Sequence, residues 1–233
     1  MGKANFLINS KGNTLIKVVG VLVVLIIIIG GAFVLWIGLP KGPKLAEVRH
    51  LREPRIVDMP VQKMLVVKAA GAPNEVGKHA FGLLMNTYFK LDGVPKGGPE
   101  FKPPRARWPV NVETPHEEWV GHYGMPVPES VTTLPDNARR GELTAELVEW
   151  EYGDVAEVLH VGSYAGEEPT VEALKKFIHE NGYKISGHHE EEYLKGPGLI
   201  FAGNPEEYLT LIRYPVKKRG EEQDTSAVEE SPG

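Results

Sequence analysis

An imperfect internal repeat is the feature of this sequence that most restricts its fold. In the second half, 155–161 has the pattern of a strand and 169–180 that of an amphipathic helix, because the apolar residues of the latter recur on one helical face. Two further strands are expected at 188–194 and 208–216. The elements of this half therefore follow the order β-α-β-β.

The first half repeats this order less clearly. A strand pattern at 64–68 precedes a helical pattern at 79–89, and 118–127 matches the closing strand of the second half. A Pro-Val pair at the end of that strand recurs 89 positions later. Two β-α-β-β units predict a pseudo-twofold α+β domain, with an antiparallel sheet, two helices on one of its faces and a cleft along the pseudo-dyad.

Residues 18–39 are a run of 22 residues without a charged side chain. As a helix this run would be about 33 Å long, enough to cross a hydrocarbon core of about 30 Å. Trp36 near one end and lysines beyond both ends are typical of a transmembrane helix. A cleaved signal peptide is the alternative, but its apolar region is shorter and ends in a small-x-small site. We expect a retained, single-pass anchor in the cell membrane.

The charges beside this run favour one orientation. Three lysines precede it and five Lys or Arg residues follow it within 41–55, so the positive-inside rule favours a cytoplasmic-facing C-terminal side. Prolines among charged residues predict a semi-rigid linker, and the polar C-terminal stretch predicts disorder. The expected segments are an N-terminal tail (1–17), the transmembrane helix (18–39), a Pro-rich linker (40–55), one folded domain (56–216) and a disordered tail (217–233).

Composition and missing motifs exclude several kinds of chemistry. The net charge of −5, from 26 Lys and Arg against 31 Asp and Glu, argues against a generally basic nucleic-acid binder. No cysteine is present, which excludes thiolate catalysis, Cys-ligated zinc and iron–sulfur clusters. The sequence has no HExxH, Walker loop or GxSxG elbow, and the neighbours His188 and His189 point apart on a strand. We expect no metal, no cofactor and no nucleic-acid partner.

The strand at 188–194 carries the candidate chemistry. Alternation along a strand places His189, Glu191 and Tyr193 on one face. A carboxylate at Glu191 beside the Tyr193 ring, facing the cleft, would suit a cationic ligand or a general base. The alternative is that the three glutamates of this strand only solvate an exposed edge.

Aromatic residues supply candidate walls for such a site. Flat rings with polar tips suit small-molecule pockets and contact cations face-on. Tyr164 is the strongest candidate, because Gly162-Ser-Tyr-Ala-Gly places it in a turn between a strand and a helix. Trp119 and Tyr123 are candidates in the first half, although ordinary core packing also explains most aromatic residues here.

Three motifs of the second half occur together in one known family. They are His160-x-Gly-x-Tyr164, x-Glu191-x-Tyr-Leu and the closing Ile212-Arg-Tyr-Pro-Val. With them, residues 56–218 resemble the GyrI-like small-molecule-binding family, the effector-binding domain of AraC- and MerR-type transcription activators. The resemblance implies a ligand pocket between two β-α-β-β units, with Glu191 as its central glutamate, followed by Tyr193, and with His160 and Tyr164 in the turn.

Departures from the family pattern leave several functions open. Ser163 stands where the family often has proline, a proline-rich insertion lengthens the first half, and the anchor occupies the place of a DNA-binding module. We rank first a membrane-tethered binding domain for a cationic or aromatic small molecule. Glu191 and Tyr164 could instead serve a small-molecule hydrolase, and the gyrase-inhibitor branch of the family suggests a protein-interaction module. A SOUL-type haem domain, with His160 or His122 as ligand, is a weaker variant of the first class.

Overall fold

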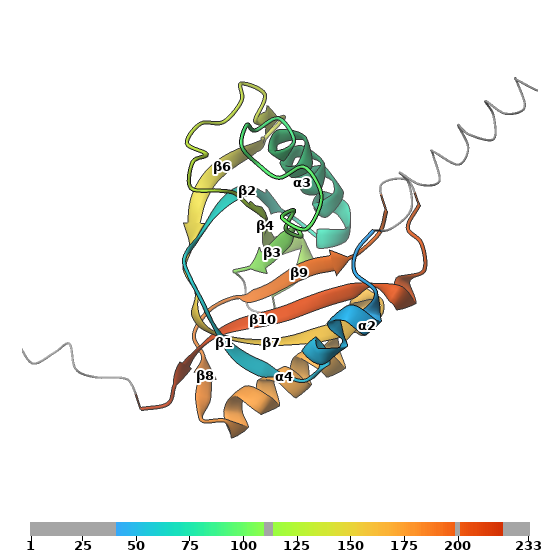
Figure 1. Ribbon diagram of the computed structural model, residues 1–233, viewed down its shortest axis with the longest axis vertical. Helices are drawn as coiled ribbons and strands as arrows, with labels where there is room; N and C mark the ends of the chain where they lie inside the picture. Colours follow the sequence, from blue (N-terminus) through green and yellow to red (C-terminus); the bar gives the residue numbers. More distant parts are fainter. Residues whose placement is uncertain (1–40, 110–113, 199–200, 221–233) are drawn as a thin grey trace, which may run out of the picture. The chain divides into compact units, whose positions relative to one another are not determined.

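The structure is a computed structural model that describes residues 41–109, 114–198 and 201–220 (Figure 1). The chain divides into two compact units, 42–196 with 205–233 and 1–41 with 197–204. The larger unit contains every helix and strand named below. Of the smaller unit, the structure describes Lys41 and part of 197–204, where Gly198 N–H donates to Phe201 O at 3.0 Å.

The larger unit is an α+β domain, as the repeat predicts. Two longer helices, α3 and α4, accompany an antiparallel sheet in the described residues, and five short helical turns, α2 and η1 to η4, lie before or between its strands (Figure 1). In chain order the elements are α2 (Leu45–Val48), η1 (Arg49–Arg52), β1 (Arg55–Met59), β2 (Gln62–Ala70), α3 (Pro73–Tyr88), β3 (Arg105–Trp108), η2 (His116–Glu118), β4 (Val120–Pro126), β5 (Arg139–Arg140), β6 (Leu143–Trp150), β7 (Gly153–Val161), η3 (Tyr164–Gly166), α4 (Glu168–Glu180), β8 (Tyr183–Ile185), β9 (His189–Lys195), η4 (Pro205–Glu207) and β10 (Leu209–Lys218).

The sheet shows the expected pseudo-twofold arrangement. The strand order is β1-β7-β10-β9-β3-β4-β2-β6-β5, with β8 paired to the end of β10. The repeat units are β2-α3-β3-β4 and β7-α4-β9-β10, and they meet where β3 pairs with β9. Trp108 lies opposite His189 and Ala106 opposite Glu191 at this central pair. Residues from the two halves of the chain are therefore neighbours at the pseudo-dyad.

One long antiparallel ribbon joins the two ends of the sheet. Strand β1 pairs with β7 down to Met59 opposite Gly153, and β2 pairs with β6 from Gln62 opposite Trp150. Between these two pairs, both sides of the ribbon advance by three residues, from Met59 to Gln62 on one side and from Gly153 to Trp150 on the other. The pairing register is therefore the same before and after the break at Pro60. We call β1–β2 together with β6–β7 the shared ribbon. The first repeat unit is thus flanked by β6, which directly precedes the second unit in sequence, and the second unit is flanked by β1, which directly precedes the first.

Both helices cover the same face of the sheet, where the two main cores lie. Helix α3 packs Leu84 and Tyr88 against β2 and β4, and α4 packs Leu174 and Ile178 against β7 and β10. Pro73 begins α3 six residues before the expected start at 79, because proline suits the first helical turn and the helix continues through Gly77. The expected strand at 118–127 begins instead at 120, after the turn η2.

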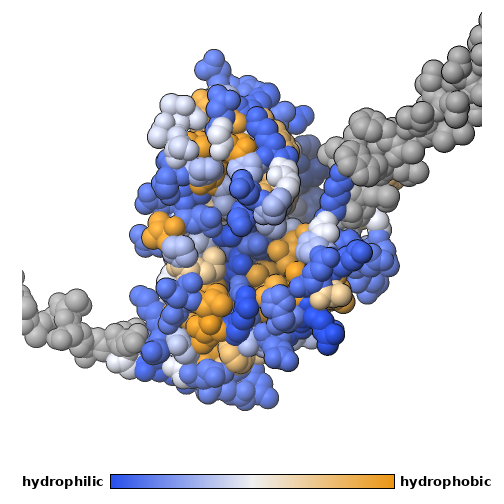
Figure 2. Space-filling view, viewed as in Figure 1, coloured by the Kyte–Doolittle hydropathy of each residue, from blue (hydrophilic) through white to orange (hydrophobic). Residues whose placement is uncertain are grey.

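The opposite face holds an ion-pair network between two small apolar clusters. Arg213 donates to Glu157 at 2.9 Å and to Glu192 at 2.5 Å, and Arg107 donates to Glu190 at 2.7 Å. Burial alone would raise the pKa of the Glu192 carboxyl, but the charges of Arg213 and Arg105 hold it below its usual range. Figure 2 shows apolar side chains in separate groups among hydrophilic ones on the surface in view.

The expected linker is partly folded into this domain. Within 40–55, the turns α2 and η1 place Val48 and Leu51 against Leu159, Leu209 and Leu211. The expected transmembrane helix at 18–39 lies outside the described residues, as do the N-terminal tail and positions 221–233 of the expected C-terminal tail. Among the helices of the described residues, none is both long and apolar enough to span a bilayer.

Candidate functional site

Strand β9 divides its acidic side chains between the two faces of the sheet. Because it pairs with β10 on one side and β3 on the other, β9 is a central strand. Glu190 and Glu192 belong to the buried ion pairs, whereas His189, Glu191 and Tyr193 lie on the helix-covered face. The alternative that these glutamates protect an exposed edge is therefore wrong, since partners on both sides leave no edge to protect.

Glu191 is the centre of the site. Its Oε1 accepts hydrogen bonds from Trp108 Nε1 at 2.8 Å and His189 Nε2 at 3.2 Å, and the Tyr193 hydroxyl donates to the same carboxylate. Burial alone would raise the pKa of Glu191, but these donors hold it below its usual range. The side chain as a whole keeps 12% of its surface exposed, and its carboxylate is ionised at neutral pH.

Seven aromatic rings form a continuous series of contacts, and two of them, Trp108 and Tyr193, donate hydrogen bonds to this carboxylate. Successive ring centroids are 4.9 to 5.7 Å apart, mostly in edge-to-face contact. We call these rings the aromatic arc, in the order Tyr208, Tyr164, Tyr193, Phe81, Tyr123, Trp108 and Trp119. Four rings come from the first half of the chain and three from the second.

Glycine at position 121 leaves room for two neighbouring rings of the arc, Tyr123 and Trp108. A Cβ on Gly121 would lie 2.7 Å from the Tyr123 ring and 2.8 Å from the Trp108 ring. Any larger residue would therefore push these two rings apart. The pKa of Tyr123 rises to about 12, because the hydroxyl is buried and the negative charge of Glu191 is near.

Tyr164, from the turn η3, lies next to Tyr208 near the other end of the arc. The residue is 40% exposed, and its hydroxyl oxygen lies close to Gly196, where an added Cβ would be 2.8 Å from that oxygen. Burial of the hydroxyl and the charge of Glu191 raise the pKa of Tyr164. The hydroxyl therefore stays protonated at neutral pH, which suits a hydrogen-bond donor better than a nucleophile.

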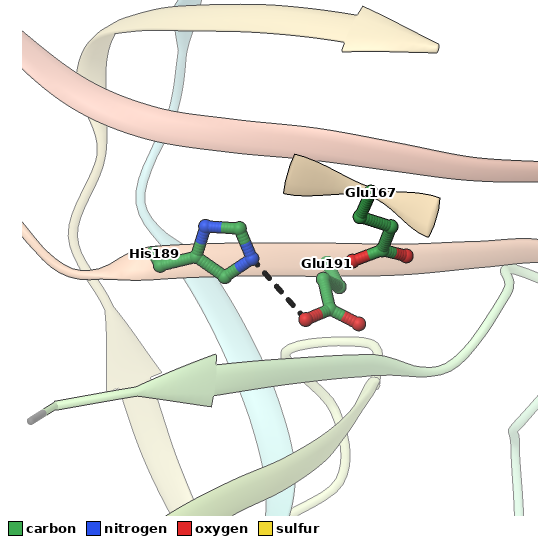
Figure 3. Close-up of side chains that lie close together, drawn as sticks. All are labelled: Glu167, His189 and Glu191. Carbon is green, nitrogen blue, oxygen red and sulfur yellow. Dashed lines mark hydrogen bonds and ion pairs between the residues drawn. The ribbon is translucent and has the colours of Figure 1, made fainter. Parts of the chain in front are cut away.

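Glu167 is a second carboxyl group that the sequence patterns do not indicate. It follows η3 directly and approaches Glu191 and His189, as Figure 3 shows. Oxygen and nitrogen atoms of the three side chains all lie within 4.8 Å of one another. Burial first, and then the charge of Glu191, raise the pKa of Glu167 to about 9. Glu167 is therefore protonated at neutral pH beside an ionised Glu191.

These three side chains are also of the types that bind metal ions. However, Glu191 Oε1 already accepts two N–H donors, and His189 Nε2 must carry its hydrogen to donate to a carboxylate. A metal ion at this point would displace both hydrogen bonds. The geometry therefore favours a ligand that bonds to the carboxyl groups without removing their donors.

His160 serves the turn rather than the site. It is buried, with Nδ1 3.0 Å from Thr170 Oγ1 and Nε2 3.1 Å from the Ser163 carbonyl oxygen. Both ring nitrogens therefore brace the segment that carries Tyr164 and Glu167. His122, the other histidine considered for haem, alternates with Tyr123 on β4 and points to the opposite face of the sheet. Neither arrangement favours a haem ligand.

The structure brings together five of the six residues that the sequence suggested for ligand binding. Glu191, Tyr193, Tyr164, Tyr123 and Trp119 belong to the site or its arc, and His160 lies beneath the turn. Sequence patterns missed Trp108 as a donor and Glu167 as a second carboxyl group, and they assigned Phe81 only to a helix face. Only the three-residue spacing from Tyr164 to Glu167 in one turn could have indicated the second carboxyl group.

Comparisons with solved structures identify the fold. An uncharacterized conserved protein from Listeria innocua matches with a TM-score of 0.59 and 22% identity, over 74% of this chain and 98% of its own. This chain has the same fold. A hydrolase from L. innocua matches with a TM-score of 0.54 and 20% identity, over 74% of this chain and 98% of its own.

A protein in complex with DNA provides a third match. EcmrR, in a cryo-EM structure of its DNA complex, has a TM-score of 0.51 and 14% identity, over 75% of this chain and 61% of its own. These matches agree with the GyrI-like fold that the motifs imply. No protein-family model and no curated relative matches the chain.

Proposed function

We propose that this protein is a membrane-anchored small-molecule-binding domain that senses an aromatic or cationic ligand. One observation carries the proposal: an ionised Glu191, whose side chain is partly exposed, accepts hydrogen bonds from two rings of the seven-membered aromatic arc. A cation gains from the carboxylate and from the faces of the rings, whereas an anion would be repelled. The GyrI-like fold supports a ligand site between the two halves, which is where Glu191 lies.

The anchoring part of the proposal rests on the sequence. The 22 uncharged residues at 18–39 are long enough to span a membrane, and the excess of basic residues after them favours a cytoplasmic domain. In this arrangement the domain would respond to compounds that enter through or accumulate near the membrane. A protease-protection assay on sealed vesicles tests the orientation, since a cytoplasmic domain is digested only when that face is accessible.

A fluorescence titration of the full chain in detergent tests ligand binding. Trp108 and Trp119 belong to the arc, so a bound ligand should change their emission. We would titrate aromatic cations of increasing size, from benzyltrimethylammonium to tetraphenylphosphonium, against wild type and Glu191→Gln. The matched control is Glu149→Gln, because Glu149 is exposed on β6. Circular dichroism verifies that each variant is folded.

The expected result is saturable binding that weakens tenfold or more in Glu191→Gln and is unchanged in Glu149→Gln. Equal affinities of the wild type and Glu191→Gln would contradict the role of Glu191. No saturable binding of any cation would contradict the ligand class and favour a protein-interaction module instead.

A hydrolase is the second candidate, and one feature of the site favours it. An ionised carboxylate, Glu191, stands beside the protonated groups Glu167 and Tyr164, which is the pairing that general acid–base catalysis needs. The test is to follow an electrophilic aromatic compound by chromatography with wild type and Glu191→Gln. Product formation that is lost while binding persists would support catalysis over sensing.

A further inference from the structure

The two carboxyl groups of the site differ in their hydrogen bonds. Glu191 accepts from Trp108, His189 and Tyr193, so its charge is already stabilised by the protein. Glu167, in contrast, has a buried Oε1 for which no hydrogen-bond partner exists within the described residues. An acceptor without a partner is costly when buried, and a ligand that donates a hydrogen bond to it removes that cost, whereas a ligand without a donor does not.

The position of Glu167 relative to Glu191 suits one bridging group. Their oxygen atoms lie within 4.8 Å of each other, and the close-up shows the two carboxyl groups side by side, one from the η3–α4 turn and one from β9 (Figure 3). A planar cation about one amidine group wide can donate one N–H to each of two such oxygens. Its positive charge also offsets the repulsion by Glu191, which after burial is the second cause of the raised pKa of Glu167.

The aromatic rings next to the two carboxyl groups also restrict the shape of the ligand. Tyr164 and Tyr193 make an edge-to-face pair 5.6 Å apart next to both carboxyl groups. A flat, conjugated cation can lie against such rings while its N–H edge points at the acids. A quaternary cation has no N–H to donate, so it would cover Glu167 Oε1 and leave it without a partner.

We propose that Glu167 and Glu191 together bind a planar cationic group that bears N–H donors, of the amidinium or guanidinium class, in preference to a quaternary cation. This inference rests on the proposed function, because it specifies the ligand of the same site. Glu167 acts as the selectivity-determining residue, and Glu191 supplies the counter-charge common to all cations.

Two probes of equal charge and similar ring test the proposal with the full chain in detergent. Benzamidinium carries N–H donors and benzyltrimethylammonium carries none, so the ratio of their dissociation constants by calorimetry isolates the contribution of the donors. The variants are Glu167→Leu, which removes the acceptor, and Glu168→Gln, a matched control at the exposed next position. The wild-type comparison needs no variant and stands even if Glu167→Leu fails to fold.

We expect wild type and Glu168→Gln to bind benzamidinium at least tenfold more tightly than benzyltrimethylammonium. In Glu167→Leu this preference should fall to about twofold or less, through loss of benzamidinium affinity alone. Equal affinities in the wild type, or a preference that survives Glu167→Leu, would overturn the inference but leave the proposed function intact. Failure of both probes and of the larger aromatic cations would overturn the two together.

Discussion

Glu167 and Glu191 are the same type of side chain, but their surroundings shift their pKa values in opposite directions. Three donors keep Glu191 ionised, whereas Glu167 is buried beside that charge with one oxygen unpartnered. Such divergent carboxyl groups are typical of functional sites, because a fold gains no stability from them. Glu167 therefore does not serve the stability of the fold, and a role in the site explains its position better.

The raised pKa of Glu167 should make the protein less stable as the pH rises. Its carboxyl group holds a proton up to about pH 9 when folded, but loses it near pH 4.3 when unfolded. Between these values the folded state binds more protons, so the free energy of unfolding falls with increasing pH. Glu167→Gln removes this dependence and should gain about 1 kcal/mol or more at pH 8, with little gain at pH 4. Urea denaturation at both pH values measures the difference, and Glu168→Gln should match wild type throughout.

Trp108 should tune the charge of Glu191. Trp108→Phe removes the N–H that donates to Oε1, so the pKa of Glu191 should rise and the domain should lose about 1.5–3 kcal/mol. Carboxyl-carbon NMR across a pH titration reports the pKa. Trp119→Phe is the control, because its Nε1 donates to the Thr114 carbonyl oxygen and not to the carboxylate. A rise of equal size in the control would show that ring size, and not the hydrogen bond, controls Glu191.

Period-two alternation explains which site residues were predictable. It correctly placed His189, Glu191 and Tyr193 on one face, because side-chain direction on a strand is a local property. Glu167 approaches Glu191 through the path of a turn and the pairing of distant strands, which no local pattern encodes. The donor Trp108 was missed for the same reason, since it meets Glu191 only across the β3–β9 pair.

Strand β9 depends strongly on its surroundings, because both of its faces carry buried acidic side chains that need partners. The internal repeat predicted that a strand occurs here in the sequence. It did not predict that this strand is central in the sheet, because the sequence pattern does not show which strands pair. The ion pairs on its far face compensate charges that would otherwise be costly to bury. The polar sequence of β9 thus fits the interior of this sheet only together with arginines on β3 and β10.

Arg213 should be the most sensitive member of that network. Arg213→Met leaves Glu157, Glu190 and Glu192 buried without their shared partner, so we expect a loss of about 3–5 kcal/mol. The exposed Arg140 on β5 gives the control, where Arg140→Met should cost less than about 0.5 kcal/mol. Denaturant unfolding compares the variants. A similar small cost at both positions would mean that the ion pairs contribute little to stability.

Across the whole domain, the shared ribbon makes the two halves depend on each other. The repeat predicted two similar units, and this is confirmed, but the exchange of β1 and β6 between them was not foreseen. An internal repeat reveals what each unit contains, whereas the exchange depends on the short bend at Pro60 and the path of the chain after it. Cooperativity between the halves follows from this exchange.

A fragment of 153–220 should therefore not fold alone. It contains one complete repeat unit, yet β7 loses β1 and β9 loses β3 when the first half is absent. We expect a poorly dispersed amide NMR spectrum from the fragment and a well-dispersed one from 42–220. Sedimentation establishes whether the fragment is a monomer, and a well-dispersed monomer would contradict this expectation.

The shared ribbon also sets the order of events during synthesis. Arg55 on β1 must wait for Glu157, which lies 102 residues later in the chain. At about 5–20 residues per second, β1 leaves the ribosome about 5–20 s before its partner strand exists. During that interval a short strand bearing Arg55 and Asp58 and ending before Pro60 resists pairing with other nascent chains. Arg55 pairs with the buried Glu157 in the finished sheet, and before that pairing its charge protects the strand from other chains.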